Sequence, residues 1–127
     1  MRILISGTRS SRSHRGSGVT FPVWTFLSNY AHVLVCIARD PDATLREIAA
    51  LVGVTERAVH RIVHELESAG VVVCVREGRR NHYSINLETP MRHPLEDDKT
   101  VGDLLEALLT KDELAALSVD APNRSTA

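Results

Sequence analysis

The first clear pattern along the chain is an apolar run over residues 30–38, YAHVLVCIA. A helix built from this run is apolar on nearly every side, which predicts a central and buried helix. Ser28 stands where an N-cap is expected, and the Asp-Pro-Asp sequence at residues 40–42 ends the helix. The sequence therefore predicts a buried helix from about residue 28 to Arg39.

Two further helices follow, and each begins after a threonine. Thr44 and Glu47 have the spacing of a capping box, in which each residue satisfies a free backbone N–H of the other. Thr55 can cap the next helix, which ends at Ala69 before Gly70, a frequent stop signal. Each helix carries one apolar stripe: Leu45, Ile48, Ala49 and Val52 in the first, and Val59, Ile62, Val63 and Leu66 in the second.

The pattern then changes from helical spacing to alternation. Residues 71–76 are mostly valine, and residues 82–87 place Tyr83, Ile85 and Leu87 on one face. Residues 77–81, Glu-Gly-Arg-Arg-Asn, connect the two runs and predict a hairpin turn. Further along, the prolines within residues 89–94 predict irregular structure.

The last apolar pattern predicts a C-terminal helix. Thr100 can cap it, and its apolar residues are Val101, Leu104, Leu105, Leu108 and Leu109. The capping spacing returns at Thr110 and Glu113, so we expect the helix to break and restart there.

The order of these elements predicts a mainly α fold with a small β-hairpin, a winged helix-turn-helix, plus a C-terminal helix. Ala49 is small and allows two helices to approach closely, Gly53 supplies the tight turn, and Val54 can fill the corner. Val59 and Ile62 lock the second helix onto the first. In such a unit the second helix is held where it can enter a major groove of DNA.

The stretch TLREIAALVGVTERAVHRIVHELESAGVVVCVREGRRNHYSI resembles winged-helix transcriptional regulators of the MarR-like or ArsR-like bacterial kind. Its LESAG sequence followed by a valine-rich strand is typical of the passage from recognition helix to wing. The resemblance covers roughly residues 25–90 and implies a DNA-binding regulator. The chain is short for the complete MarR architecture, and MRHPL after the wing suggests a small regulator group with its own C-terminal helix.

Length and composition suggest how the chain is divided. Its 127 residues allow one domain plus tails. We expect a flexible basic tail over residues 1–20, a winged-helix domain over 21–95, a C-terminal helical segment over 96–118 that can take part in dimerisation, and a flexible tail over 119–127. A later translation start, near Val19, remains an open alternative.

Charge and cysteine usage limit the function classes less than the motifs do. The net charge is −1, with four arginines and no acidic residue in residues 1–22 and eight acidic against four basic residues in residues 91–127. The overall balance therefore does not itself indicate nucleic-acid binding. No apolar run is long enough for a membrane span, and two cysteines in apolar runs fit a reducing cytoplasm better than a disulfide framework.

The candidate DNA contacts come from the helix over residues 55–69 and the wing over residues 76–82. Arginine can make paired hydrogen bonds to guanine, and arginines of a wing can enter a narrow minor groove or meet the backbone. Thr55 and the helix start can hold a phosphate, Ala58 can meet a thymine methyl, and Asn81 is either a turn residue or a contact. The predicted DNA-binding residues are Thr55, Arg57, Ala58, His60, Arg61, His64, Arg79, Arg80 and Asn81.

Other interpretations of the same residues stay open. His60 and His64 lie four apart and could grip a metal, with His82 or His93 as further ligands, but no carboxylate or cysteine joins them at an obvious spacing. The more economical prediction is no metal and no cofactor. No phosphate loop or nucleophile–base motif is present, so an enzyme is not expected.

The expected partners are double-stranded DNA and a second copy of the chain, with a small-molecule effector left open and no membrane. We expect the dimer to form through the first helix and residues 101–109, because a small domain has little room to cover so much apolar surface. Trp24 and Phe26 could line an effector pocket, although packing at the domain edge is the simpler interpretation. The alternative function is a winged-helix module that contacts proteins without binding DNA.

Overall fold

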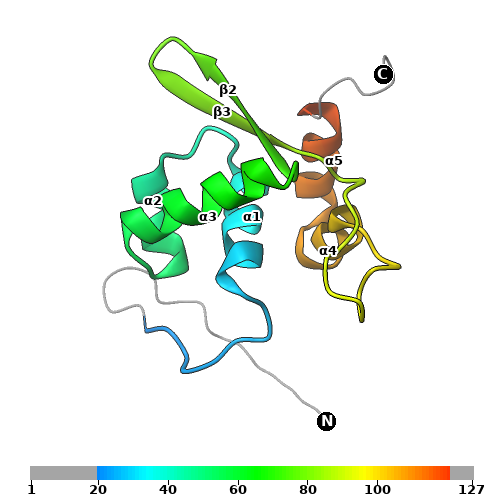
Figure 1. Cartoon of the computed structure of the whole chain (residues 1–127). Coiled ribbons are helices and arrows are strands. Elements are labelled where there is room, and N and C mark those ends of the chain that lie inside the picture. Colours follow the sequence, from blue (N-terminus) through cyan, green and yellow to red (C-terminus); the bar gives the residue numbers. More distant parts are fainter. Residues whose placement is uncertain (1–19, 121–127) are drawn as a thin grey trace.

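Residues 20–120 are described by the computed structural model, which contains helices and one hairpin. The elements are α1 (Asn29–Arg39), α2 (Leu45–Val52), α3 (Glu56–Ser68), β2 (Val72–Glu77), β3 (Arg80–Ile85), α4 (Val101–Leu108) and α5 (Lys111–Asp120). Figure 1 shows α1 between α3 on one side and the pair α4 and α5 on the other. The tails predicted over residues 1–19 and 121–127 lie outside the described residues.

Helix α1 is the centre of the core, as its sequence predicts. It packs against α2, α3, α5 and β3. Its buried side chains are Ala31, Val33, Leu34, Ile37 and Ala38. Ser28 precedes the helix in extended conformation, but its hydroxyl makes no capping hydrogen bond. Burial of apolar side chains therefore stabilises this helix more than its N-cap does.

The predicted helix-turn-helix is present. The Thr44 amide donates to Glu47 Oε1 at 2.9 Å, and the Glu47 amide donates to Thr44 Oγ1 at 3.1 Å, which completes the capping box. Thr55 Oγ1 accepts from the Ala58 amide at 3.0 Å at the start of α3. Gly53 joins the two helices with φ of +89°, a left-handed conformation that favours glycine.

The hairpin is longer, and its turn tighter, than the sequence suggested. The antiparallel register runs from Val72 opposite Ile85 to Glu77 opposite Arg80, so Gly78 and Arg79 alone make the turn. The predicted connection over residues 77–81 was wrong. Charged residues near the tip obscured the strands, because backbone pairing continues there without an apolar face to mark it. Gly78 has φ of +65°, which suits this tight turn.

Two contacts attach the hairpin to the loop between α1 and α2. The Tyr83 amide donates to the Pro41 carbonyl at 2.9 Å. His82 Nδ1 lies 2.8 Å from Asp42 Oδ1. The middle of β3 is thus fixed to this loop, while the tip of the hairpin projects past α2 and α3 (Figure 1).

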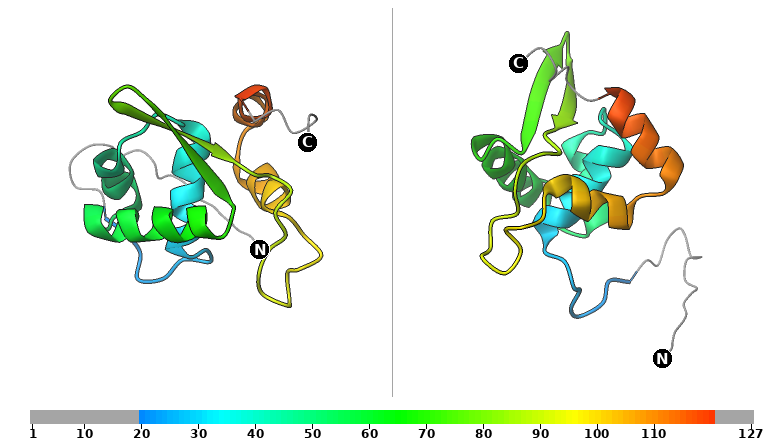
Figure 2. Two further views of the ribbon diagram at one scale, coloured as in Figure 1. Left: turned by 45° about the horizontal axis from the view of Figure 1, so that its top comes forward. Right: turned by 90° about the vertical axis from the view of Figure 1, so that its right-hand side faces the viewer.

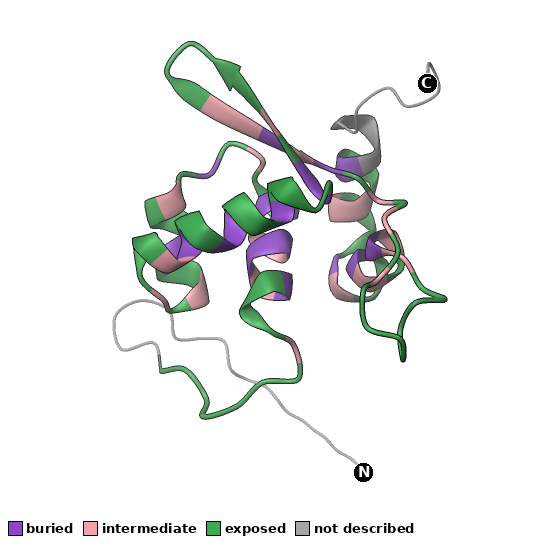
Figure 3. Ribbon diagram, in the orientation of Figure 1, coloured by how far each residue is buried: buried purple, intermediate pink, exposed green. Residues whose placement is uncertain are grey.

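The C-terminal helices fold onto the same core. Capping boxes at Thr100 and Thr110 begin α4 and α5, so the predicted break between two helices is confirmed. Leu105, Leu109 and Leu117 join the core cluster of the winged helix. In Figure 2 the two helices lie against the side of α1, and Figure 3 colours part of each helix as buried. Much of the apolar surface expected to form a dimer is therefore covered within one chain.

Candidate nucleic-acid interface

Helix α3 has one buried and one exposed face. Val59, Ile62, Val63 and Leu66 are buried against the other helices. The outer face carries the exposed residues Arg57, His60, Arg61, His64 and Ser68. Four of the predicted contacts, Arg57, His60, Arg61 and His64, therefore share one exposed face of α3, the helix that lies across the front of the molecule in Figure 1.

The start of α3 is organised differently from this outer face. Thr55 is exposed, but its side-chain oxygen already accepts the Ala58 amide. Ala58 is half-buried beside it. Glu56 adds a negative charge in the first turn. A phosphate at this helix start would therefore meet free backbone N–H groups together with an acidic neighbour.

One flank of the outer face is tied to α1. Arg61 Nη1 donates to the Tyr30 hydroxyl at 3.3 Å and lies 3.7 Å from Glu65 Oε1. The Tyr30 hydroxyl in turn donates to Glu65 Oε1. Sequence reasoning missed this cluster. The spacing of Arg61 and Glu65 by one helical turn was a visible signal, but nothing in the sequence placed Tyr30 beside them.

The opposite flank faces the hairpin. His60 and His64 line a hollow of about 390 Å³ together with Arg76, Asn81 and Tyr83. Asn81 pairs with Arg76 in the strand ladder and is half-buried, so it is not the turn residue. The hairpin and α3 therefore lie side by side along this hollow.

A second hollow brings the wing arginines to the starts of α2 and α3. Its volume is about 510 Å³, and Arg46, Arg79 and Arg80 line it together with Glu47 and Glu56. Sequence analysis named Arg79 and Arg80 but overlooked Arg46, which is exposed on α2. The structure therefore adds a third arginine to the wing side of the surface. The acidic side chains there reduce its positive potential.

The thiols belong to the packing of the domain. Cys36 and Cys74 are both free and partly buried against the core. Burial raises the pKa of each thiol above its ordinary value. A raised pKa keeps the reactive thiolate scarce, which fits a packing role better than a redox switch.

Among residues 20–120, no three side chains of His, Cys, Asp and Glu come together as a group that could hold a metal ion. No helix in this part of the chain combines the length and apolar character needed to cross a membrane.

Comparison with known proteins supports the fold. A family model described as winged helix-turn-helix DNA-binding matches residues 32–73, which run from α1 to the start of β2. The winged helix-turn-helix resemblance is therefore confirmed over this segment. No curated protein sequence matches the chain.

Two solved structures are similar to this chain. One is the PcaV transcriptional regulator of Streptomyces coelicolor in complex with its natural ligand, with 22% identity, a TM-score of 0.43, and coverage of 71% of this chain and 67% of that one. The other is ZitR of Lactococcus lactis, a zinc-responsive MarR family member, with 18% identity, a TM-score of 0.40, and coverage of 80% and 75%. At these scores neither structure indicates what this chain binds.

Proposed function

We propose that this winged helix-turn-helix protein binds duplex DNA in a sequence-specific manner and regulates transcription. The observation that carries the proposal is the outer face of α3, where Arg57 and Arg61 are exposed in the segment that matches DNA-binding winged helices. The match of residues 32–73 to a DNA-binding winged-helix model supports DNA binding, and no enzymatic activity is part of the proposal.

In the proposed complex, α3 enters the major groove. Its first turns are nearest to base edges, where Arg57 and Arg61 can make paired hydrogen bonds to guanine. His60 and His64, on the wing side of the same face, can donate to a base acceptor or to phosphate. Together these contacts supply the sequence preference.

The wing contributes contacts that are less dependent on sequence. Arg79 and Arg80 are exposed at and beside the turn, and Arg46 lies across the same hollow. Three guanidinium groups in this position suit phosphates along the backbone or a narrow minor groove. The wing would therefore add affinity and fix the orientation of α3.

The proposed regulator acts in the cytoplasm as a homodimer. Two copies of α3 would lie in successive major grooves, about one DNA turn apart. Such an arrangement predicts a target with two related half-sites.

A second candidate function is a protein-binding winged helix. It is favoured by the acidic residues Asp42, Glu47 and Glu56, which line the same hollow as the wing arginines. A protein-only module would have no salt-sensitive affinity for DNA, whereas phosphate contacts release counterions and make affinity fall with salt.

Selection of genomic fragments tests the proposed function. The purified protein is incubated with sheared genomic DNA at moderate salt, and the retained fragments are sequenced. We expect a short motif with two related halves to be enriched. Retention of fragments without any shared motif would contradict sequence-specific binding.

A further inference from the structure

Among the described residues, several large apolar side chains are exposed in the segment before α1. We call residues 20–28, TFPVWTFLS, the arm; it contains no charged residue. Val23, Trp24 and Phe26 in the arm are 101%, 67% and 92% exposed. Trp24 and Phe26 form an edge-to-face pair with centroids 5.0 Å apart, so two large rings stand together in solvent.

Beside the arm lies a large hollow that is lined mainly by apolar groups. We call it the arm groove. Its volume is about 880 Å³, and its apolar walls include Phe21, Val35, Leu51, Val52 and Leu108. Leu51 is 68% exposed, although it lies on a helix of the core domain. Trp24 and Phe26 do not line this groove, so these two rings leave it unfilled in their own chain.

The arm is held at its beginning by a specific contact. A Cβ placed on Gly53 would lie 2.8 Å from the Phe21 ring, so this ring packs directly on the turn between α2 and α3. At the other end the arm enters α1 at Asn29. The middle of the arm, with Trp24 and Phe26, is thus presented between two fixed points.

We propose that a second copy of this chain covers this face, with Trp24 and Phe26 of each protomer seated in the arm groove of the other. A two-fold axis requires one face to carry both complementary features, and the arm and its groove adjoin on the same molecule. The uncharged arm suits the apolar side chains that make up most of the groove walls, and the charged residues Arg39, Asp40 and Glu47 also line the groove.

The available area is sufficient for this dimer. Four aromatic side chains, two from each protomer, can bury about 150–250 Å² each. The groove walls that they cover bring the total above the ~1,000 Å² expected of a specific interface. By contrast, the apolar faces of α1 and α4 are largely used inside one chain, with Ile37 and Leu105 fully buried.

This inference deepens the dimer of the proposed function by naming its interface, and its test needs no DNA. Trp24 is the only tryptophan in the chain, so its fluorescence reports on the arm alone. At micromolar concentration we expect a dimeric mass by light scattering and blue-shifted emission. Dilution should give a monomeric mass together with a red shift. A parent protein that is monomeric at these concentrations would overturn the proposal.

Three variants make the test specific. The double variant Trp24→Ser, Phe26→Ser lacks the inserted rings, and Leu51→Glu puts a charge in the groove; each alone should be monomeric with the circular dichroism of the parent. Leu95→Ser is the matched control, because Leu95 is 87% exposed in the segment between β3 and α4 and does not line the groove. This variant should remain dimeric.

Mixing the two monomeric variants distinguishes a groove contact from stacking of the two arms. The mixture should form a heterodimer that is weaker than the parent dimer and visible at higher concentration, because only one intact arm, that of the Leu51→Glu chain, can enter one intact groove. If the Leu51→Glu variant dimerises with the same affinity as the parent, the groove is not the binding site of the partner's arm. Loss of the dimer on removing residues 1–18 would mean that this tail, and not the partner's arm, fills the groove. Light scattering tests this interface without DNA. Salt-dependent DNA binding by the monomeric double variant tests the proposed function without the dimer, so either proposal can fail while the other stands.

Discussion

At the scale of single residues, Arg61 combines a proposed DNA contact with an internal role. Its side chain is 60% exposed, yet its guanidinium group lies near both the Tyr30 hydroxyl and the Glu65 carboxylate. These partners reduce the number of orientations the side chain samples in the free protein. The Arg61 side chain therefore loses less conformational entropy when its guanidinium group contacts a base edge.

We expect Arg61→Ala to weaken binding to the preferred DNA by about 1–3 kcal/mol and to relax preference at one position of each half-site. Unfolding free energy should change little, since exposed ion pairs contribute about 0–1 kcal/mol. Arg39→Ala is the control, because Arg39 also makes an exposed ion pair, with Glu113 at 3.4 Å, but belongs to α1 and not to α3. Binding isotherms on preferred and unrelated duplexes measure the DNA affinity of both variants. Equal losses of affinity in the two variants would contradict base readout by Arg61.

Arg80 should behave differently because it lies on the wing. If it contacts phosphate or a narrow minor groove, Arg80→Ala weakens binding to preferred and unrelated duplexes to a similar extent. The slope of log affinity against log salt should fall by about one unit, because one fewer phosphate is neutralised by the protein. Titrations at several salt concentrations give the slope, and an unchanged slope would remove Arg80 from the interface.

The sequence indicated the exposed residues of α3 and of the wing, but not the neighbouring residues that contact them. The outer face of α3 followed directly from the spacing of its apolar stripe. Tyr30 and Arg46 could not be assigned in the same way, because their places depend on how α1 and the wing pack against α3 and α2. Such contacts between residues far apart in sequence leave no periodic signal.

At the scale of elements, the turn between α2 and α3 depends on Gly53. Gly53→Ala should destabilise the fold by about 1–3 kcal/mol, because a Cβ is strained at positive φ and must also displace the Phe21 ring. Gly70→Ala is the matched control, since its φ is +80° with nothing within 4 Å of the added Cβ. Urea unfolding should rank Gly53→Ala as the less stable variant. In a Phe21→Ala background the two should become equal, and a persistent difference would argue against the ring contact.

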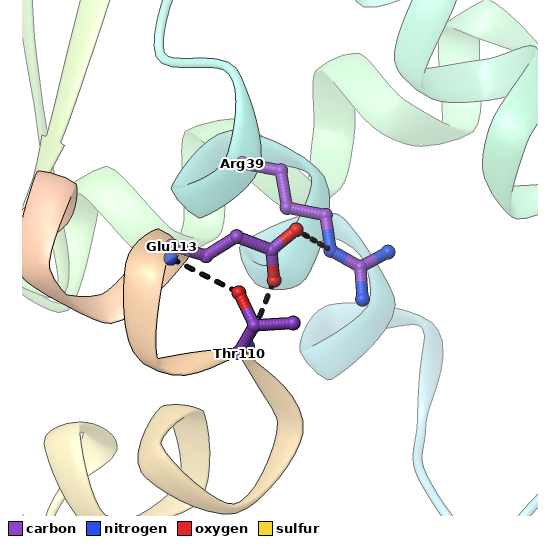
Figure 4. Close-up of polar contacts among 3 residues, drawn as sticks. All are labelled: Arg39, Thr110 and Glu113. Carbon is purple, nitrogen blue, oxygen red and sulfur yellow. Dashed lines mark hydrogen bonds and ion pairs between the residues drawn. The ribbon is translucent and has the colours of Figure 1, made fainter.

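The capping residue Glu113 at the start of α5 makes the stability of the fold depend on pH in the acid range. Hydrogen bonds with Thr110, assisted by Arg39, hold the pKa of the Glu113 carboxyl below its usual value of 4.5 (Figure 4). A carboxyl with a lowered pKa in the folded state stabilises the fold above its unfolded value and loses that contribution as pH falls through the folded value. Parent stability should therefore fall more steeply than that of Glu113→Gln below pH 4.5.

Urea unfolding across this acid range measures the difference between parent and variant. Glu106→Gln provides the control, because it removes an exposed carboxylate from α4 without removing a helix cap. Parallel pH profiles for the parent and Glu113→Gln would contradict the assigned role of Glu113.

The helices were easier to predict than the hairpin for a physical reason. Thr44, Thr100 and Thr110 start helices through local hydrogen bonds that depend only on residues three positions apart. The end of the hairpin at Glu77 and Arg80 is set by pairing across strands, where both side chains face solvent. Solvent-facing pairs carry no apolar alternation, so the sequence placed the turn too broadly.

At the scale of the whole molecule, the C-terminal helices complete the core of the winged helix. Leu105 is fully buried and Leu117 is 4% exposed. Because these leucines pack into the core cluster, the arm and its groove become the main candidate for an apolar interface among the described residues. The dimer expected from the sequence therefore remains a proposal, but its expected interface moves from α1 and α4 to the arm.

The arm and the tip of the wing lie apart, although the arm groove and the hollow beside the wing arginines share Asp40, Ala43 and Glu47. The arm lies below the helices in Figure 1, whereas the hairpin projects from their opposite end. A second protomer on the arm would consequently leave the tip of the wing uncovered. Substitution of Trp24 and Phe26, which line neither hollow, should therefore change dimer formation without removing a proposed DNA contact.

The central claim is that the outer face of α3 reads duplex DNA. The most direct test is a titration of a selected genomic duplex and an unrelated duplex, at several salt concentrations, with the parent and with the double variant Arg57→Ala, Arg61→Ala. We expect salt-dependent binding and a preference of at least about 10³ for the selected duplex in the parent. The double variant should lose most of this preference while keeping part of the salt-dependent affinity through the wing. Equal binding of both proteins to both duplexes, or no salt-dependent affinity at all, would contradict the central claim.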